Sequence, residues 1–481
     1  MTQLPTLAGL WVFGLLMLMG TVQANELLQI NGQFRSTPTV FAQTPTSLHL
    51  PPTLPNAARR LANTIQHINL TPLSATERQQ FQPSSANATQ GMHIGIGRAV
   101  VRGFGLPTSW QWQDVPHGKA ALLSITSPDA ERVRMQLRFA ALPPGTELRF
   151  YAPNDPATVY GPYTPTDMTS LRKDGAGYYL FWSPSVSGNT LNTEIFLPAN
   201  QVVSNLNFEV PQVSHVVLEP TTGETQTNTL VEDTSCYSST ACANPAMQTI
   251  GKSVAKYLYT DEKGATFTCS GTLLNSTTHN SEPYFLTAHH CLDTVAKIAS
   301  LQPIWFYSES RCGSQDAAKK AYYGPSGGQL LIAQPWIDMV FIYLRTPLPA
   351  DVYLSGWSAV PFQGNEAVVG IHHAYGWPQM ATQGIFRHFA KRINNPNGTF
   401  DAIPDPYGTY IAVDWFTGAT AAGASGSGLW TGDYLTGTLL GGTASCMNQM
   451  GVSVYGRFDL AYPALQHWLN PTLPLTSTPI L

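Results

Sequence analysis

Short segments in which apolar and polar residues alternate fill the chain from about residue 95 to residue 212. Four of them read VRMQLRFAAL, ELRFYAP, GYYLFWSPSV and NTEIFLPA, and turn-forming clusters such as LPPGT, APNDP and SVSGN separate them. A side-chain period of two with regularly spaced turns predicts antiparallel strands. We therefore expect a β-sandwich-like domain over residues 95–218.

The first 94 residues carry a different pattern. Residues 7–20 form an uncharged apolar stretch, too short to span a bilayer as a helix, and Val22-Gln23-Ala24 follows it. This predicts a signal peptide over 1–24 and secretion into the medium or the periplasm. An uncleaved anchor or a buried helix is the alternative. No Lys or Arg precedes Arg35, so the basic region that usually comes before the apolar stretch is missing. Residues 25–94 are expected to be a linker or N-terminal arm with one short helix around AARRLANTIQHI.

A second unit is expected over residues 236–471. Residues 219–235 (EPTTGETQTNTLVEDTS) hold four acids and no sustained apolar pattern, which is typical of an exposed linker. All six cysteines follow this stretch. Long helices are not expected there, apart from one at PALQHWL, and residues 472–481 read as a C-terminal tail.

Composition narrows the possible classes of function. The chain has 481 residues, of which 11% are charged and 43% hydrophobic, and its net charge is −4. The apolar content is enough to bury a core, so disorder is not expected. No basic surplus is present to neutralise phosphates, so we expect no nucleic-acid partner. The length favours two or three domains.

Three segments carry candidate chemistry. Phe285-Leu286-Thr287-Ala288-His289-His290-Cys291 ends an apolar run in histidine, Asp338 stands alone among strand-forming residues, and Gly423-Ala424-Ser425-Gly426-Ser427-Gly428 is a loop of small residues. Each alone is more often structural. Together they offer a hydroxyl nucleophile, a base to remove its proton and a carboxylate to orient that base. Glycines also let backbone amides turn inward, as an oxyanion site requires.

The segments resemble a known family. TAHHC is similar to the TAAHC block of trypsin-like (chymotrypsin-fold) serine proteases, GASGSG is similar to their GDSGG block, and Ser355-Gly356-Trp357 resembles the segment after their aspartate. The bacterial lysyl endopeptidase branch is closer still, since FLTAHHC, Ile371-His372-His373 and Tyr455-Gly456-Arg457 have counterparts in it. The resemblance covers about 236–471 and implies a double antiparallel β-barrel. It also implies His290 as general base, Asp338 as its orienting acid, Ser425 as nucleophile and the amides of Gly423 and Ser425 as oxyanion donors.

The six cysteines alone leave 15 pairings open. The resemblance implies three disulfides, namely Cys236–Cys446, Cys242–Cys312 and Cys269–Cys291. A zinc site built from His289, His290, Cys291 and the pair His372-His373 is the rival interpretation. It is disfavoured because adjacent histidines on a strand point to opposite faces. We expect no metal and no other cofactor.

The chain departs from the resembled family at three positions. Ala424 replaces the aspartate with which trypsins pair a new N-terminus, so any latency must come from residues 25–235. Lysyl endopeptidases have an acid two residues before their YGR, where this chain has Ser453, and a histidine where it has Leu440. A specificity pocket at Ser453 and Leu440 would lack the counter-ion that a lysine substrate needs.

The composition of the linker is consistent with a protease that prefers an uncharged residue before the cleaved bond. No Lys or Arg lies between Lys173 and Lys252, so an enzyme specific for lysine or arginine could not cut there. If the protein matures itself in the linker, it accepts another residue. We expect apolar or small side chains, while Glu219, Glu224 and Glu232 leave a preference for glutamate open.

The sequence thus predicts an all-β secreted serine endopeptidase made as a precursor. The N-terminal β domain would be a propeptide that assists folding and inhibits. The partners of the mature protease would be protein or peptide substrates and its own propeptide. We expect the mature form to be a monomer that is not bound to a membrane. Two alternatives remain, namely a retained N-terminal binding module, whose groove could use Trp110, Trp112 and Trp182, and an inactive binding homologue.

Overall fold

The computed structural model describes most of the chain between residues 65 and 471. The described residues are 39–40, 65–81, 91–100, 110–169, 174–218, 235–278, 281–314, 316–317, 321–345, 347–396, 398–448 and 450–471. The predicted signal peptide, nearly all of the predicted linker 219–235 and the tail 472–481 lie outside them. Among the described residues, no helix combines the length and the apolar character needed to cross a membrane.

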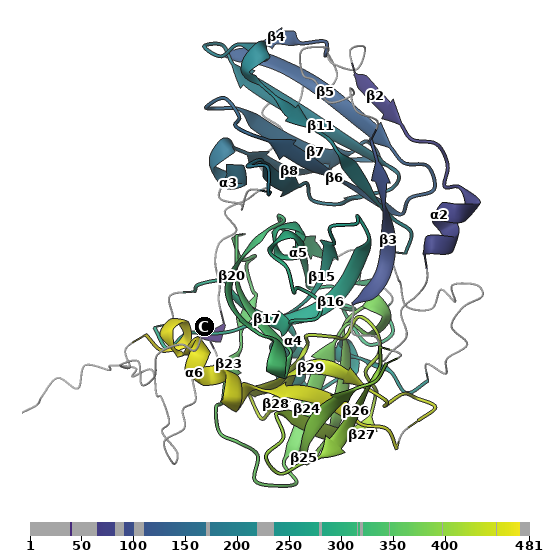
Figure 1. Cartoon of the computed structure of the whole chain (residues 1–481), viewed down its shortest axis with the longest axis vertical. Helices are drawn as coiled ribbons and strands as arrows, with labels where there is room; N and C mark the ends of the chain where they lie inside the picture. The colour runs from purple at the N-terminus through teal and green to yellow at the C-terminus, as the bar shows by residue number, and fades with distance from the viewer. Residues whose placement is uncertain are drawn as a thin grey trace, which may run out of the picture.

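The N-terminal unit is a sandwich of two sheets (Figure 1). One sheet contains β2 (Gln66–Asn69), β4 (Gln113–Val115), β5 (Gly118–Thr126), β7 (Glu147–Ala152), β8 (Asp155–Tyr163) and β11 (Thr190–Pro198). The other contains β3 (Met92–Ala99), β6 (Arg132–Phe139), β9 (Tyr179–Trp182), β10 (Val186–Ser187), β12 (Phe208–Glu209) and β13 (Gln212–Val216). Apolar side chains from both sheets, among them Leu123, Met135 and Phe150, form one core. The alternating pattern that predicts this sandwich arises because every second residue faces that core.

The N-terminal arm differs from its prediction. The predicted helix over AARRLANTIQHI ends instead in β2, which pairs in parallel with β5 and buries Ile68 in the core; residues 57–64 lie outside the described part. Burial against the sheet outweighs the weak local helix preference of this stretch. The helix of this region is α2 (Ala75–Gln80), which begins at a capping box formed by Ser74 and Glu77. The β-rich unit therefore begins before residue 95.

The first half of the C-terminal unit is an open half-barrel. Its strands follow the order β18 (Gln302–Trp305), β15 (Val254–Thr260), β16 (Thr266–Leu273), β17 (Tyr284–Ala288), β21 (Met339–Leu344) and β20 (Gly328–Gln334). Their inner side chains, including Tyr257, Phe285 and Trp305, form a second core.

The second half is a closed barrel of six strands. They are β24 (Ala367–His372), β25 (Met380–Asn394), β27 (Tyr410–Thr417), β30 (Ser453–Arg457), β29 (Tyr434–Gly442) and β28 (Gly428–Thr431). The barrel closes because the long strand β25 pairs with both β24 and β27. The predicted terminal helix is confirmed as α6 (Phe458–Leu469). These halves, with the sandwich, confirm the predicted all-β class and double-barrel architecture.

Shorter elements complete the fold. They are β1 (Thr39–Val40), β14 (Ser238–Ser239), β19 (Tyr322–Tyr323), β22 (Tyr353–Leu354), β23 (Gly356–Trp357), β26 (Phe400–Pro404), α3 (Pro165–Thr169), α4 (Pro245–Gly251), α5 (Val295–Ser300), η2 (Val203–Asn205), η3 (Thr240–Cys242), η5 (Pro335–Ile337) and η6 (Ala374–Gly376).

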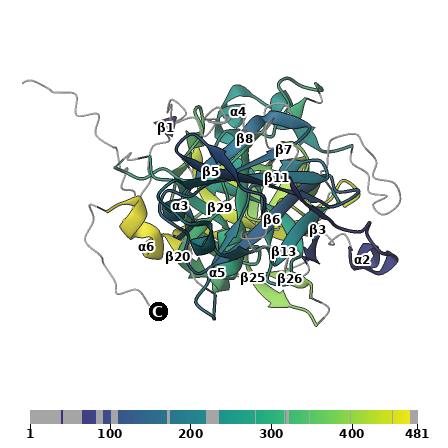
Figure 2. The same ribbon diagram turned by 90° about the horizontal axis from the view of Figure 1, so that it is seen from above.

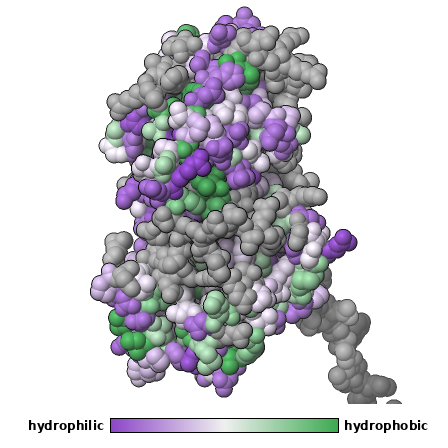
Figure 3. Space-filling model, turned by 90° about the vertical axis from the view of Figure 1, so that its right-hand side faces the viewer, coloured by the Kyte–Doolittle hydropathy of each residue, from purple (hydrophilic) through white to green (hydrophobic). Residues whose placement is uncertain are grey.

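The sandwich and the half-barrel share one continuous sheet, because β3 pairs with β13 on one side and with β16 on the other. Seen from above, the sandwich lies over the barrels (Figure 2). A buried arginine adds a second contact: Arg134 donates to the carbonyl oxygen of Ser300 at 2.7 Å and to Ser326 Oγ at 3.1 Å. Burial lowers the pKa of Arg134 to about 9. On the face drawn in Figure 3, hydrophilic and hydrophobic side chains are interspersed over the sandwich.

Candidate active site

A buried histidine and a buried aspartate meet on the half-barrel. His290 follows the end of β17, and Asp338 lies between η5 and β21, where its φ of +54° turns the chain sharply. Asp338 Oδ2 is 2.6 Å from His290 Nδ1, and Asp338 Oδ1 accepts the backbone N–H of His290 at 2.9 Å. The side chains are 7% and 3% exposed. The carboxylate therefore fixes the ring so that Nε2 is the nitrogen left to act on a substrate.

Ser425 lies in a tight loop between β27 and β28 of the closed barrel. Gly423 and Gly426 on either side have φ of +89° and +83°, a conformation that glycine adopts without steric cost. A Cβ on Gly426 would overlap Thr287 Oγ1 and the carbonyl oxygen of Ser270. The loop therefore lies directly against the strands that carry His290.

Ser270 on β16 connects this loop to the half-barrel. Its N–H donates to the carbonyl oxygen of Ser425 at 2.9 Å, and its hydroxyl donates to the carbonyl oxygen of Gly423 at 2.9 Å. The same hydroxyl accepts the backbone N–H of His373 at 3.0 Å. Sequence reasoning missed Ser270, although its position directly after Cys269 is a signal that could have found it.

Three of the predicted site groups have no hydrogen-bond partner within the described part of the chain. His290 Nε2 has no hydrogen-bond partner there, and it does not bond to Ser425 Oγ in this structure. The amides of Gly423 and Ser425 likewise donate to no described residue. Backbone N–H groups without an internal acceptor, close in sequence to a hydroxyl, are the kind of donor that an oxyanion site uses.

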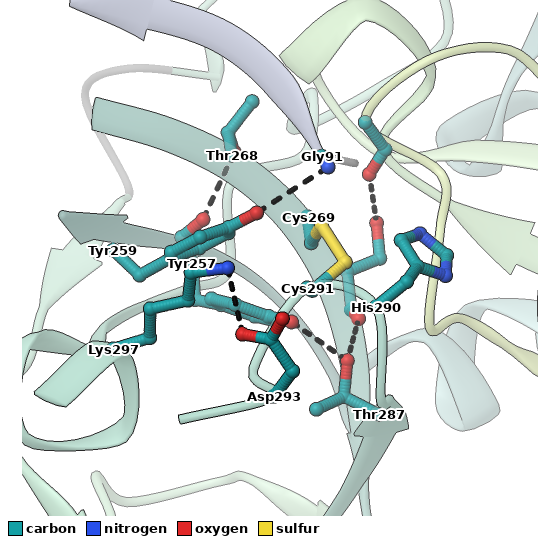
Figure 4. The surroundings of a disulfide bond; sticks show 12 residues. Gly91, Tyr257, Tyr259, Thr268, Cys269, Thr287, His290, Cys291, Asp293 and Lys297 are labelled. Carbon is teal, nitrogen blue, oxygen red and sulfur yellow. Dashed lines mark hydrogen bonds and ion pairs between the residues drawn. A yellow bond between two sulfur atoms is a disulfide. The ribbon is translucent and has the colours of Figure 1, made fainter. Parts of the chain in front are cut away.

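The C-terminal unit contains three disulfides, with the pairing that the resemblance implies: Cys236–Cys446, Cys242–Cys312 and Cys269–Cys291. Figure 4 shows the last of these beside His290, where it links β16 to the histidine loop. Cys291 is thereby not free to bind a metal.

The rival zinc interpretation also uses His289, His372 and His373, of which His372 and His373 are buried. Burial lowers the pKa of His372 and of His373 to about 3 in each case, and burial also lowers the pKa of His289. His373 Nδ1 is 2.9 Å from the carbonyl oxygen of Trp377. Burial thus favours the neutral form of each ring, and His373 lies beside the loop, since its backbone N–H donates to Ser270 Oγ.

The two predicted pocket residues lie on different faces. Ser453 is fully buried, and its Oγ accepts Trp415 Nε1–H at 2.8 Å and lies 2.8 Å from Thr420 Oγ1. Leu440 instead packs with Phe400, Tyr410 and Val454. Val454 points to the opposite face of β30 from Ser453. The side chain of Ser453 therefore points toward Thr420, on the segment that leads to Ser425, whereas the side chain of Leu440 points away although its neighbour Leu439 bonds to the loop. Trp415 and Thr420 were not predicted.

Comparison with known proteins decides the family. A family model for the lysyl endopeptidase N-terminal domain matches residues 69–217, and one for the lysyl endopeptidase C-terminal domain matches residues 230–456. A lysyl endopeptidase of Pseudomonas aeruginosa is 27% identical over 430 residues, which cover 81% of this chain and 88% of that protein. The chain is a lysyl endopeptidase-like serine protease. The protease is a serine endopeptidase, as predicted.

Solved structures resemble the protease only distantly. The HtrA-type protease AlgW with tripeptide is 17% identical with a TM-score of 0.30, and the match covers 47% of this chain and 63% of AlgW. The MamO protease domain from Magnetospirillum magneticum is 11% identical with a TM-score of 0.31, over 45% of this chain and 98% of that domain. The chain thus spans under two thirds of AlgW.

Proposed function

We propose that the protein is a secreted serine endopeptidase that hydrolyses peptide bonds with a triad of Ser425, His290 and Asp338. The observation that carries this proposal is the buried contact of 2.6 Å between His290 and Asp338, beside a glycine-rich loop that holds Ser425. A buried carboxylate on a histidine whose other nitrogen is unpaired is the arrangement of a general base.

The reaction is an acyl transfer in two stages. Ser425 Oγ attacks the carbonyl carbon while His290 Nε2 takes its proton, and the amides of Gly423 and Ser425 donate to the resulting oxyanion. The C–N bond then breaks, and His290 gives its proton to the leaving amine. Water attacks the acyl ester with His290 again as base, which releases the acid and restores Ser425. This chemistry uses no cofactor.

Labelling with a serine-directed phosphonofluoridate tests the nucleophile. Wild type should be labelled, Ser425→Ala should not, and Ser427→Ala should still be labelled. Ser427 is the matched control because it lies two residues away in the same loop, where its hydroxyl is fully buried without a partner among the described residues. Labelling that persists in Ser425→Ala and disappears in Ser427→Ala would transfer the role to Ser427.

We further propose a neutral pocket for the side chain before the scissile bond. Ser453 stands where the resembled branch has an acid, and its hydroxyl is engaged by the neutral groups of Trp415 and Thr420. A lysine ammonium buried there would meet no carboxylate at this position. Digestion of a peptide library should therefore release small or apolar C-terminal residues. Products ending mainly in Lys or Arg would exclude this pocket, and products ending in Glu would favour the glutamate alternative.

Secretion and processing complete the proposal. Residues 1–24 would be a leader, 219–235 the maturation linker, and the sandwich a propeptide; three disulfides suit an oxidising compartment outside the cytoplasm. Sequencing the N-terminus of the secreted protein tests this. A start near 230–236 supports a removed propeptide, whereas a start at Asn25 supports the retained binding module.

A further inference from the structure

One strand of the sandwich lies along the edge of the half-barrel that leads to Ser425. β3 runs antiparallel to β16, with Met92 opposite Thr268, His93 opposite Phe267 and Gly95 opposite Thr266. β13 pairs with β3 only from Gly95 to Ala99. Met92 and His93, the first residues of β3, thus pair with the half-barrel, while the carbonyl oxygen of Ile94 accepts the N–H groups of Val217 and Leu218, which follow β13.

The next two residues of β16 connect this pairing to the loop that carries Ser425. Going along β16 from Thr268, the next residue is Cys269, whose disulfide joins it to the neighbour of His290. The one after is Ser270, whose N–H bonds to the carbonyl oxygen of Ser425. Because the strands are antiparallel, following β16 toward Ser425 means following β3 backward toward Gly91. Figure 4 shows Gly91 beside the disulfide, with His290 on its far side.

In this orientation β3 runs in the same direction as the substrate residues that follow the scissile bond. Residues Met92 to Gly95 leave the catalytic loop in the N-to-C direction, as the residues after a scissile bond must do. We propose that the β16 edge Thr266–Thr268 binds the leaving-group side of peptide substrates by strand addition, and that β3 occupies this edge as a built-in competitor. The inference rests on the proposed function and adds to it the surface through which the sandwich inhibits.

Specific contacts hold β3 in this position. The N–H of Gly91 donates to Tyr259 Oη at 3.3 Å. The rings of Phe81, His93 and Phe267 follow one another at 5.1 and 5.0 Å between centroids, and Phe267 stacks on Tyr259 at 5.4 Å. Glycine at position 91 is required, because a Cβ there would lie 2.6 Å from Cys269 Sγ and 2.8 Å from Tyr259 Oη.

Gly91→Val tests the proposal in the full chain, purified intact and checked by mass. The added side chain should displace the start of β3 and raise kcat/KM about tenfold or more for a peptide that extends three residues past the scissile bond, since about two backbone hydrogen bonds are lost. A p-nitroanilide substrate, which ends before the β16 edge, should gain much less. Ala99→Val, at the exposed far end of β3, should change neither rate.

A second variant guards against a folding defect. Tyr259→Phe removes only the hydroxyl that accepts from Gly91, and should raise hydrolysis of the extended peptide about threefold. If folded Gly91→Val and Tyr259→Phe proteins leave the extended peptide unchanged, or raise both substrates equally, the β16 edge is not the competitor's site. Phosphonofluoridate labelling separates the two proposals: a chain that is never labelled at Ser425 contradicts the proposed function, whereas a labelled chain without the selective gain contradicts this inference alone.

Discussion

Gly426 is the position at which the catalytic loop is most sensitive to a single methyl group. Its φ is +83°, and a Cβ would overlap Thr287 Oγ1 and the carbonyl oxygen of Ser270 and lie 2.7 Å from the backbone nitrogen of Ala288. Two of these three atoms belong to the backbone of strands in the half-barrel. Gly426→Ala should therefore push the loop away from His290, because the strands cannot move aside.

The magnitude follows from two separate costs. A non-glycine residue in the left-handed region costs about 1–2 kcal/mol, and overpacking against fixed atoms adds about 1–3 kcal/mol. Gly432→Ala is the matched control, since Gly432 has a φ of +58° but no atom within 4 Å of its Cβ position. Gly432→Ala should lower the free energy of unfolding only by the cost of the left-handed conformation, about 1–2 kcal/mol. A loop displaced by about 1 Å should also lose about 100-fold in rate.

Urea unfolding and phosphonofluoridate labelling of Ser425 measure these two effects. Gly426→Ala should unfold at lower urea than Gly432→Ala and react about 100-fold more slowly, while Gly432→Ala reacts as wild type. If both variants lose the same free energy and are labelled at the wild-type rate, the loop is not held against the half-barrel as the geometry requires.

Three further predictions follow from the site. Asp338→Asn should lower kcat/KM about 10⁴-fold, because the amide cannot hold the histidine tautomer, whereas the surface control Asp293→Asn should keep the wild-type rate of peptide hydrolysis. Burial lowers the pKa of His372 to about 3. As the pH falls from 7 to 5, this histidine therefore binds a proton in the unfolded chain but not in the native state, and the native state loses stability. Urea titrations should show wild type losing about 2 kcal/mol more than His372→Leu over that range, and equal losses would contradict a neutral buried ring. Cys269→Ala with Cys291→Ala opens a loop of 22 residues and should lower the unfolding free energy by about 3 kcal/mol; a loss below about 1 kcal/mol would be evidence against this crosslink.

The residues of the candidate site could be found from sequence because each lies in a short local segment. Histidine after an apolar strand, an acid at the start of another strand and serine among glycines are visible without knowing which strands pair. The partners that hold them are not visible in this way. Ser270 and Gly423 are 153 residues apart, and no local pattern encodes that pairing.

Two positions show where sequence reasoning reaches its limit. The helix expected over AARRLANTIQHI ends in a strand, since pairing with β5 buries Ile68, while the capping box at Ser74 and Glu77 marks the real helix. The pocket at Leu440 and Ser453 stays a prediction, and in the structure the two side chains lie on opposite faces. The two-residue period of a strand means that a correct position along the chain still leaves the face undetermined until the register is known.

The contacts of Ser270 have a consequence for when activity appears as the chain folds. Ser270 of the half-barrel donates to the carbonyl oxygens of both Gly423 and Ser425, and the loop that carries them belongs to the closed barrel. A folding intermediate with only the half-barrel formed thus has His290 but not Ser425. One with only the closed barrel formed has Ser425 but lacks the contact with Ser270. Under the proposed triad, neither barrel alone can hydrolyse a peptide, and activity requires the contact between the two barrels that Ser270 makes.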